Sequence, residues 1–313
     1  VGLDFHFVEH IFVVRNKFAC RARRHNYNDR SANQAEDVAQ MSPNHQFSLN
    51  FRQSYKKLIM LYRLVTTFLY FCIVISKNTI KLIHSLGTKK GREKTGLFVA
   101  EGPKVVGDLR TAGFHAEQVI EDPDDVRHAS FLQHPQGVLG VFRIPEYAFT
   151  KVGGTDNLHG LVLALDGVQD PGNVGTIIRV ADWFGIEDIV CSAQTADCWS
   201  PKVIQATMAS IARVRVRYVG DLARFISNLP DDYPVYGTLL NGKNIYSSPL
   251  TEEGLIVMGN EGNGISNEVR PLIKSPLLIP NYPEGRSTAD SLNVAIATAV
   301  TCAEFRRRVV VKG

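Results

Sequence analysis

The chain has 313 residues, of which 44% are hydrophobic and 21% charged, and its formal net charge is +4. This length allows two domains with a sizeable core, and the mildly basic balance permits a nucleic-acid partner without requiring one. The five cysteines form no C-x-x-C pair, which argues against a disulfide framework or a zinc site. We therefore expect a cytoplasmic protein with buried, inert thiols and no metal.

Residues 1–75 differ from the remainder of the chain. A polar stretch at 21–46 has neither helical nor strand periodicity, and Leu58–Ile75 is mostly apolar but interrupted by Arg63. Three interpretations compete: a membrane anchor, a buried apolar segment, or upstream sequence translated from a misplaced start, with Val74 at a GTG codon. We favour the third, expect no membrane partner, and leave 1–75 unassigned, as disordered or upstream sequence.

Strands and helices alternate over residues 76–146. A short amphipathic helix (79–86) precedes a basic turn (89–94), a strand (96–100) and a helix with Pro103 in its first turn. A strand (116–122), a helix (124–134) and a closing strand (137–144) follow. This order predicts a small α/β domain, joined by a polar, glycine-containing linker at 147–159.

The same alternation continues over residues 160–313. Strands are predicted at 161–165, 187–193, 213–219, 233–240, 254–259 and 275–280. Helices are predicted at 174–185, 200–211, 221–229, 267–273 and 290–310. The pattern predicts a mainly parallel sheet with helices on both faces, in which ligands bind beyond the carboxyl ends of the strands.

The first informative strand end is the loop and helix at 165–186. Val174, Ile177 and Ile178 form an apolar stripe, and Arg179 lies almost opposite to it on the helical wheel. Arg179 therefore faces solvent, a ligand or a partner. Asn173 lies about two turns before it, at the turn that begins the helix.

The second strand end is the sequence Gly-Asn-Glu-Gly-Asn-Gly at 259–264. Its spacing and late position exclude a dinucleotide-binding fingerprint, and the absence of Gly-Lys-Ser/Thr excludes a P-loop. The glycines suit positive φ angles. Two alternatives are left: a tight turn, or a loop that brings its backbone against a flat polar ligand, with Glu261 at its centre.

The third strand end runs from Ile279 to the final helix. After a polar loop, Ser291, Leu292 and Asn293 enter a helix rich in alanine. Ser291 could serve only as the N-cap. Asparagine is a poor helix former, so Asn293 within the helix suggests a second role.

Together these three stretches resemble the SpoU family of RNA ribose methyltransferases, within the SPOUT superfamily. The motifs are "DPGNVGTIIRVADWFG", "VMGNEGNGIS" and "IPNYPEGRSTADSLNVAIATAV", and they occur in the family's order. Residues 80–106 resemble the small substrate-binding domain that many members carry. The resemblance covers roughly 77–313; the segment from Ile279 to Ser291 is longer than is usual in the family.

The resemblance implies a knotted, SPOUT-type α/β domain with a deep C-terminal trefoil knot, preceded by a small α/β RNA-binding domain. It also implies a homodimer with the active site at the interface and S-adenosylmethionine as the cofactor. The residues it assigns to catalysis are Asn173, Arg179, Glu261, Ser291 and Asn293. Those it assigns to the cofactor are Gly259, Gly262, Ile279 and Leu292.

The expected function is S-adenosylmethionine-dependent 2′-O-methylation of a ribose in ribosomal RNA, without a metal. The alternatives are a transfer-RNA substrate and a non-catalytic RNA-binding protein on the same fold. Because a free guanidinium is a poor base, we expect Arg179 to orient the ribose hydroxyl. Phosphate contacts are expected from basic side chains of the small domain, unless these form only a solvated surface: Lys81, Lys89, Lys90, Arg92 and Lys94.

Overall fold

The computed structural model describes residues 75–148 and 158–310, except 284–285, 287–288 and 290. The described residues belong to one compact unit, Ile75–Gly313. The interpretations of residues 1–74, including nearly all of the apolar stretch that begins at Leu58, lie outside the described residues. Within the described part, no helix is long and apolar enough to cross a membrane.

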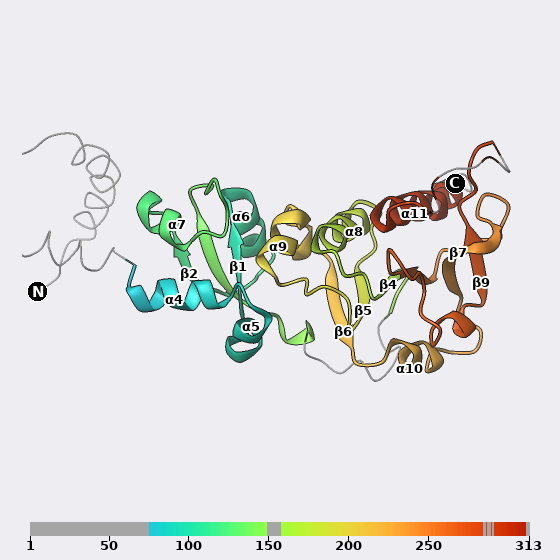
Figure 1. Ribbon diagram of the computed structural model, residues 1–313, viewed down its shortest axis with the longest axis horizontal. Coiled ribbons are helices and arrows are strands. Elements are labelled where there is room, and N and C mark those ends of the chain that lie inside the picture. The colour runs from blue at the N-terminus through green and yellow to red at the C-terminus, as the bar shows by residue number, and fades with distance from the viewer. Residues whose placement is uncertain (1–74, 149–157, 284–285, 287–288, 290, 311–313) are drawn as a thin grey trace, which may run out of the picture. The chain divides into compact units, whose positions relative to one another are not determined.

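A three-stranded antiparallel sheet organises residues 77–143 (Figure 1). The strands are β1 (Leu97–Glu101), β2 (Ala116–Ile120) and β3 (Leu139–Arg143), and β3 lies between the other two. The helices are α4 (Lys77–Ser85), α5 (Lys89–Thr95), α6 (Pro103–Thr111) and α7 (Pro123–Ala129). The predicted strands are thus present, whereas the last predicted helix is shorter, ending at Ala129 instead of 134.

The basic segment predicted as a turn is the helix α5. The hydroxyl of Thr88 caps its first turn by accepting a hydrogen bond from the backbone N–H of Gly91 (3.1 Å), and Gly96 ends it at a φ of 66°. The prediction of a turn was wrong. The helix is too short to show an apolar stripe in the sequence, and it is stabilised by the capping residues Thr88 and Gly96.

A six-stranded parallel sheet organises residues 161–310, in the order β6-β5-β4-β8-β7-β9. Its strands are β4 (Leu161–Asp166), β5 (Asp188–Ser192), β6 (Arg215–Val219), β7 (Val235–Asn244), β8 (Gly254–Gly259) and β9 (Ser275–Leu278). Its α-helices are α8 (Pro171–Trp183), α9 (Pro201–Thr207), α10 (Leu222–Ser227) and α11 (Val294–Val310). The predicted parallel sheet is confirmed.

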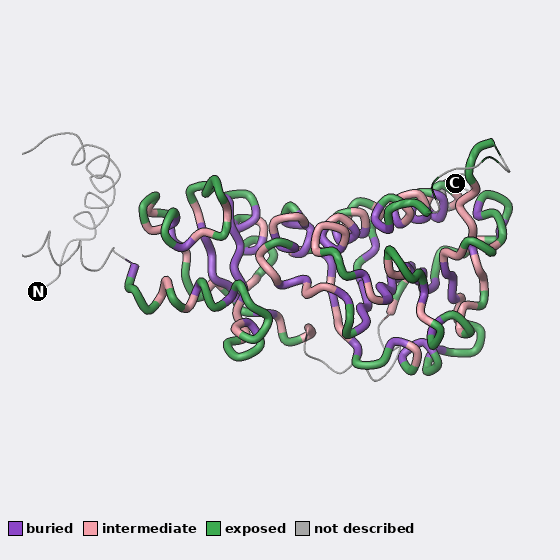
Figure 2. The backbone as a smooth tube through the Cα atoms, viewed as in Figure 1, coloured by how far each residue is buried: buried purple, intermediate pink, exposed green. Residues whose placement is uncertain are grey.

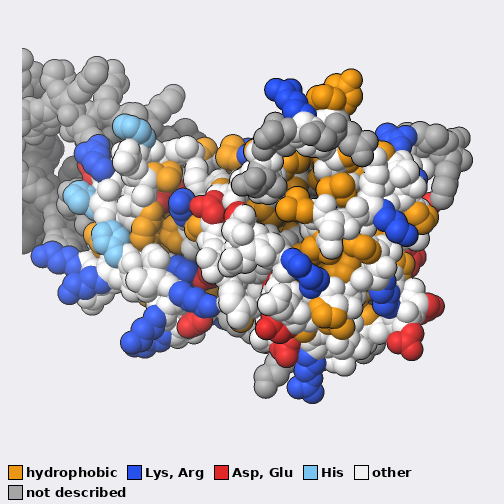
Figure 3. Space-filling view, turned by 45° about the vertical axis from the view of Figure 1, so that its right-hand side comes forward, with side chains coloured by type: hydrophobic (Ala, Val, Ile, Leu, Met, Phe, Trp, Pro, Cys, Tyr) orange, Lys and Arg blue, Asp and Glu red, His pale blue; other side chains and the backbone are white. Residues whose placement is uncertain are grey.

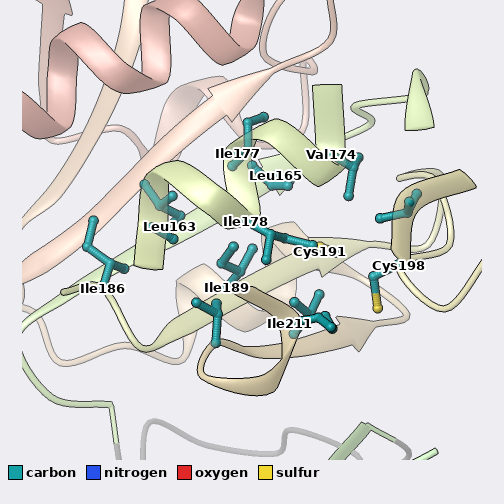
Figure 4. Packing of buried hydrophobic residues seen from close by; sticks show 14 of the residues in the cluster. Leu163, Leu165, Val174, Ile177, Ile178, Ile186, Ile189, Cys191, Cys198 and Ile211 are labelled. Carbon is teal, nitrogen blue, oxygen red and sulfur yellow. The ribbon is translucent and has the colours of Figure 1, made fainter. Parts of the chain in front are cut away.

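Helices cover both faces of this sheet because successive side chains of each strand point to opposite sides. Leu163 and Leu165 of β4 pack in the core beneath α8, α9 and α11, whereas Val162 and Ala164 pack in the core beneath α10. Figure 4 shows the first of these cores, and Figure 2 shows the buried residues following the strands. This two-sided burial explains why β4 is a continuous apolar run, LVLAL, without alternation.

Three cysteines are buried as expected: Cys191, Cys198 and Cys302. Burial raises the pKa of the Cys302 thiol to about 12 and that of Cys198 well above its ordinary value. These thiols stay protonated at neutral pH and are therefore poor nucleophiles and poor metal ligands. Cys20 and Cys72 lie outside the described residues.

The two sheets share one hydrophobic core through Trp199, which precedes α9. Its ring lies 4.8 Å from that of Phe98 on β1, measured between centroids, and also contacts Phe114. Beside it, the guanidinium of Arg92 donates from Nε and Nη2 to one carboxylate oxygen of Asp197 (2.9 and 2.6 Å). A third donation reaches the carbonyl of Leu86 (2.6 Å). An apolar contact and a buried ion pair therefore join the small domain to the larger one.

This arrangement overturns the sequence-based role of Arg92. Arg92 is only 3% exposed. Its guanidinium forms a hydrogen-bonded ion pair with Asp197, which lies 105 positions further along the chain. A phosphate cannot reach it without breaking that pair. Lys81, Lys89, Lys90 and Lys94 are exposed.

We expect Asp197→Ala to lower the free energy of unfolding by about 3 kcal/mol, because it leaves the buried Arg92 charge without a partner. Urea denaturation monitored by Trp fluorescence measures this. Lys89→Ala is the matched control: it removes an exposed pairing with Glu93 at 4.0 Å and should change stability by less than about 0.5 kcal/mol. A loss of under about 1 kcal/mol for Asp197→Ala would show that the ion pair does not hold the domains together.

Candidate active site

The site is built where β4 and β8 end side by side. These strands are paired in register, so Asp166 lies opposite Gly259. The loop after β4 and the glycine loop after β8 therefore leave the sheet at the same level. The main chain N–H of Ser266 donates to the buried carboxylate of Asp166 (2.7 Å), which ties the far end of the glycine loop back to β4.

Gly259 is required by close approach of the backbone, not by its φ angle. A Cβ at residue 259 would lie 2.3 Å from the carbonyl carbon of Gly264, a distance so short that any residue other than glycine would clash with the backbone. Of the three loop glycines, Gly264 alone has a positive φ, at 69°. The expectation of positive φ at Gly259 and Gly262 was therefore wrong.

Asn260 shapes the glycine loop, a role that the sequence analysis missed. Its side-chain oxygen accepts from the N–H groups of Gly262 (2.9 Å) and Asn263 (3.0 Å), and its amide nitrogen donates to the carbonyl of Gly167 (2.7 Å). An asparagine two residues before a glycine is a known turn former, so the local signal was present. Its bond to Gly167, 93 positions away, was not readable from the sequence.

Three of the predicted residues meet in one chain of hydrogen bonds. The amide nitrogen of Asn173 donates to Oε1 of Glu261 (2.8 Å), and the amide nitrogen of Asn293 donates to Oδ1 of Asn173 (3.0 Å). The partners are 88 and 120 positions apart. The three strand-end loops identified from the sequence therefore converge at one place.

Asn173 is held in position by the start of α8. The carboxylate of Asp170 is the N-cap and accepts from the main chain N–H of Asn173 (2.8 Å), and Pro171 occupies the first helical position. Asp-Pro-Gly-Asn is thus a helix start that fixes the main chain of Asn173. Asp170 was missed, although aspartate followed by proline at the start of an apolar stripe is a recognisable N-cap signal.

Asn293 begins the final helix and does not lie within it. Its side-chain oxygen accepts from the N–H groups of Ala295 (3.0 Å) and Ile296 (3.3 Å), and α11 starts at Val294. The predicted start at 290 was wrong, and the N-cap expected at Ser291 is Asn293. The second role suggested for Asn293 is its bond to Asn173.

Arg179 lies about two turns beyond Asn173 on α8, with its side chain exposed, as the helical wheel predicted. One turn further, Trp183 is 85% exposed. Ile296 on α11 is 53% exposed. Figure 3 shows hydrophobic side chains exposed among basic ones on one face of the molecule.

A cavity of about 480 Å³ adjoins the amide chain. Its lining includes all four residues assigned to the cofactor by resemblance, Gly259, Gly262, Ile279 and Leu292, together with Glu261 and Ser291. The segment 238–241 after the start of β7 forms another wall, which the sequence analysis missed. The volume falls within the roughly 300–1,000 Å³ of small-molecule sites, and the walls combine apolar side chains with loop backbone, as such sites do.

Among the described residues there is no group of three or more His, Cys, Asp or Glu side chains that could hold a metal ion. The described groups of the site are carboxamides, a carboxylate, a guanidinium and loop backbone. Their chemistry is hydrogen bonding and positioning.

Two family models match this chain. The SpoU rRNA Methylase family matches residues 160–303, and the MRM3-like substrate binding domain matches residues 77–162. Among curated relatives, the 23S rRNA (guanosine(2553)-2′-O)-methyltransferase RlmP of Bacillus subtilis is 30% identical over 242 residues, covering 71% of this chain and 93% of that protein. The human mitochondrial rRNA methyltransferase 3 is 30% identical over 169 residues, and the match covers 46% of this chain and 40% of that protein.

Solved structures agree with the fold. A protein described as an RNA methyltransferase of the TrmH family, from Porphyromonas gingivalis, is 36% identical with a TM-score of 0.66, covering 75% of this chain and 99% of that one. The AdoMet-bound rRNA methyltransferase from Sinorhizobium meliloti is 28% identical with a TM-score of 0.65, covering 75% and 97%. With these matches and the convergence of its three motifs, the chain belongs to the SpoU family of RNA methyltransferases.

Proposed function

We propose that this protein transfers a methyl group from S-adenosylmethionine to the 2′-oxygen of a ribose in ribosomal RNA. The observation that carries the proposal is the hydrogen-bonded chain Glu261–Asn173–Asn293 beside the 480 Å³ cavity. The relatives named as rRNA methyltransferases support ribosomal RNA as the substrate. Transfer RNA and a non-catalytic role are alternative outcomes of the test below.

The cavity residues fit S-adenosylmethionine. The glycine loop, Ile279 and Leu292 offer backbone groups to a polar nucleoside, and the side chains of Leu239, Ile279 and Leu292 offer apolar surface to its flat base. Glu261 lines the cavity and accepts a hydrogen bond from Asn173, and its carboxyl group would favour a positively charged sulfonium nearby. When bound, the cofactor supplies an electrophilic methyl group.

The chain's own residues position the ribose. In the contacts described, Asn173 uses one N–H toward Glu261 and one lone pair toward Asn293, so its amide retains a further N–H and lone pair for a hydroxyl. Holding a hydroxyl in attack geometry contributes much of the rate in such a transfer. The amide orientation is set by Glu261 on one side and, on the other, by Asn293, whose side chain also caps α11.

Arg179 acts as a donor in this proposal. Its guanidinium offers several N–H donors, which orient the 2′-oxygen and stabilise the negative charge that develops there. In the transfer, a bond between the ribose oxygen and the methyl carbon would form, the sulfur–methyl bond of the sulfonium would break to leave a neutral thioether, and the hydroxyl proton would pass to solvent. Exposure of Arg179 on the outer face of α8 leaves it accessible to RNA.

We further propose that the protein works as a homodimer through α8 and α11, and that its C-terminal segment forms the family's trefoil knot. Trp183 near the end of α8, 85% exposed, and Ile296 near the start of α11, 53% exposed, support the first, because each leaves a large apolar side chain exposed on one of these helices. The return of α11 to pack on α8, with Arg306 Nε donating to the carbonyl of Phe184 (2.8 Å), is compatible with the second.

The small domain would bind RNA phosphates through its exposed lysines. Lys89, Lys90 and Lys94 project from α5, whose buried side holds Arg92 against Asp197. A helix anchored on one face by an ion pair presents the remaining charges at a fixed position. Such contacts position RNA without specifying its sequence.

We expect the purified protein to transfer label from S-adenosylmethionine to ribosomal RNA taken from a strain lacking the gene, and the modified ribose to resist alkaline cleavage. Arg179→Ala should reduce the rate by about 100-fold or more, because the oxygen loses its charged donor. Label in transfer RNA would change the substrate, and none in any fraction would favour the non-catalytic alternative. Near-wild-type transfer by folded Arg179→Ala would remove Arg179 from the mechanism.

Asn293→Asp separates the two roles of Asn293. Aspartate still caps α11 but has no N–H for Asn173, so stability should change little while methyl transfer falls by about tenfold or more. Asn293→Ala removes both roles and should also lower the free energy of unfolding by about 1 kcal/mol. Thermal denaturation measures the stability of both variants, and single-turnover kinetics measures their rates of methyl transfer. Full activity of Asn293→Asp would show that Asn293 serves only as a cap.

Neutralising Lys89 and Lys90 together, as Lys→Gln changes, should weaken RNA binding and reduce the slope of log affinity against log salt by about one to two. Filter binding at a series of salt concentrations measures the slope. Lys274→Gln is the control: its ammonium is already occupied by the carbonyls of Pro230, Asp231 and Tyr233. An unchanged slope for the double variant would exclude this face of α5 from the RNA footprint.

A further inference from the structure

A second cavity, of about 440 Å³, lies at the carboxyl ends of β4, β5 and β6. Asn260, Asn263 and Gly264 line both this cavity and the proposed cofactor cavity. A ligand in one is therefore separated from a ligand in the other by a single turn of chain. The proposed reaction assigns no role to this second cavity.

The lining of the second cavity is polar and acidic. Carboxylates come from Asp166, Asp221 and Glu268, and side-chain amides from Gln169, Gln194, Asn260 and Asn263. Its lining includes no Lys, Arg or His, and all of these lining residues belong to the described part of the chain. The charge therefore disfavours a phosphate and favours a neutral group rich in N–H donors.

The floor of the cavity is held firmly while its rim is open. Ser192 Oγ accepts from the main chain N–H of Gly167 (2.9 Å), and buried Asp166 accepts from Ser266 (2.7 Å). By contrast, Gln169, Gln194 and Glu268 are exposed. A fixed floor with exposed donors and acceptors at its rim is suited to hydrogen bonding with the polar edge of a flat ligand.

Apolar surface is also present in the same cavity. Leu222, Ala223 and Val269 contribute to its lining beside the polar groups. Leu222 and Val269 are 4% and 2% exposed, so the partly exposed Ala223 and the surrounding backbone present the apolar surface to the face of a flat ring, with its edge toward the carboxylates and amides. This combination matches how proteins bind single-stranded bases, by packing on the ring face and hydrogen bonding to the edge.

We propose that this cavity binds a nucleobase of the RNA substrate, either that of the methylated nucleotide or of its immediate neighbour, and that the base carries an exocyclic amino group. The inference rests on the proposed function, since the neighbouring cavity must hold the methyl donor. Carboxylates accept from amino and imino N–H groups, so Glu268 and Asp221 favour an amino-bearing edge. Uracil, which has no amino group, is disfavoured. Gln169, Gln194 and Glu268 are then specificity-determining residues.

The test begins by mapping the nucleotide that the wild-type protein methylates, and then uses synthetic RNA fragments carrying that site. Exocyclic amino groups are removed one at a time from the methylated base and from each neighbour. Removal at one of these positions should raise the KM for the fragment by about tenfold. The combined variant Gln194→Ala with Glu268→Gln should show a similar rise in KM for the unmodified fragment. It should no longer distinguish this fragment from the one that lacks the amino group.

Asn228→Ala is the matched control, since Asn228 is exposed at the far end of α10 from Leu222, and it should keep wild-type KM and discrimination. The affinity of the cavity variant for S-adenosylmethionine, measured by calorimetry, should equal that of wild type. Weakened cofactor binding instead of weakened RNA binding, or unchanged discrimination, would overturn this inference while leaving the proposed function standing. Absence of methyl transfer by wild type would overturn both.

Discussion

The in-register parallel pairing of β4 with β8 is the constraint on which the site depends. It sets Asp166 opposite Gly259, so the loops that follow both strands begin at the same edge of the sheet. The approach of Gly264 to within 2.3 Å of where a Cβ of residue 259 would lie requires glycine there. A shift of either strand by one residue would reverse the faces of its side chains and separate the loops.

Asn293 connects the end of the fold to the proposed chemistry. One side of its carboxamide begins α11 and the other orients Asn173, whose own main chain is fixed by Asp170. The side chain that meets the ribose in our proposal is thus held by two helix starts and one carboxylate. Rigid support of this kind is how a site made only of hydrogen-bonding groups reaches the geometry that transfer requires.

The basic segment 89–94 shows how one short helix can serve two purposes. Arg92 turns inward to Asp197 and attaches the small domain, while Lys89 and Lys90 remain exposed. Charge in the sequence suggested one shared function for all of them. The division follows in part from helical geometry, because residues two positions apart, such as Lys90 and Arg92, point in nearly opposite directions.

The sequence by itself determined the alternation of strands and helices, the parallel character of the sheet and the three polar loops at strand ends. These are local properties: two-sided burial makes apolar runs such as 161–165, and the stripe of Val174, Ile177 and Ile178 places Arg179 outward. The tertiary structure alone decided the inward turn of Arg92, the bonds from Asn260 to Gly167 and from Asn293 to Asn173, and the two cavities that share one turn. Those partners are about 90 to 120 positions apart, and only the packing of the folded chain brings them within hydrogen-bonding distance.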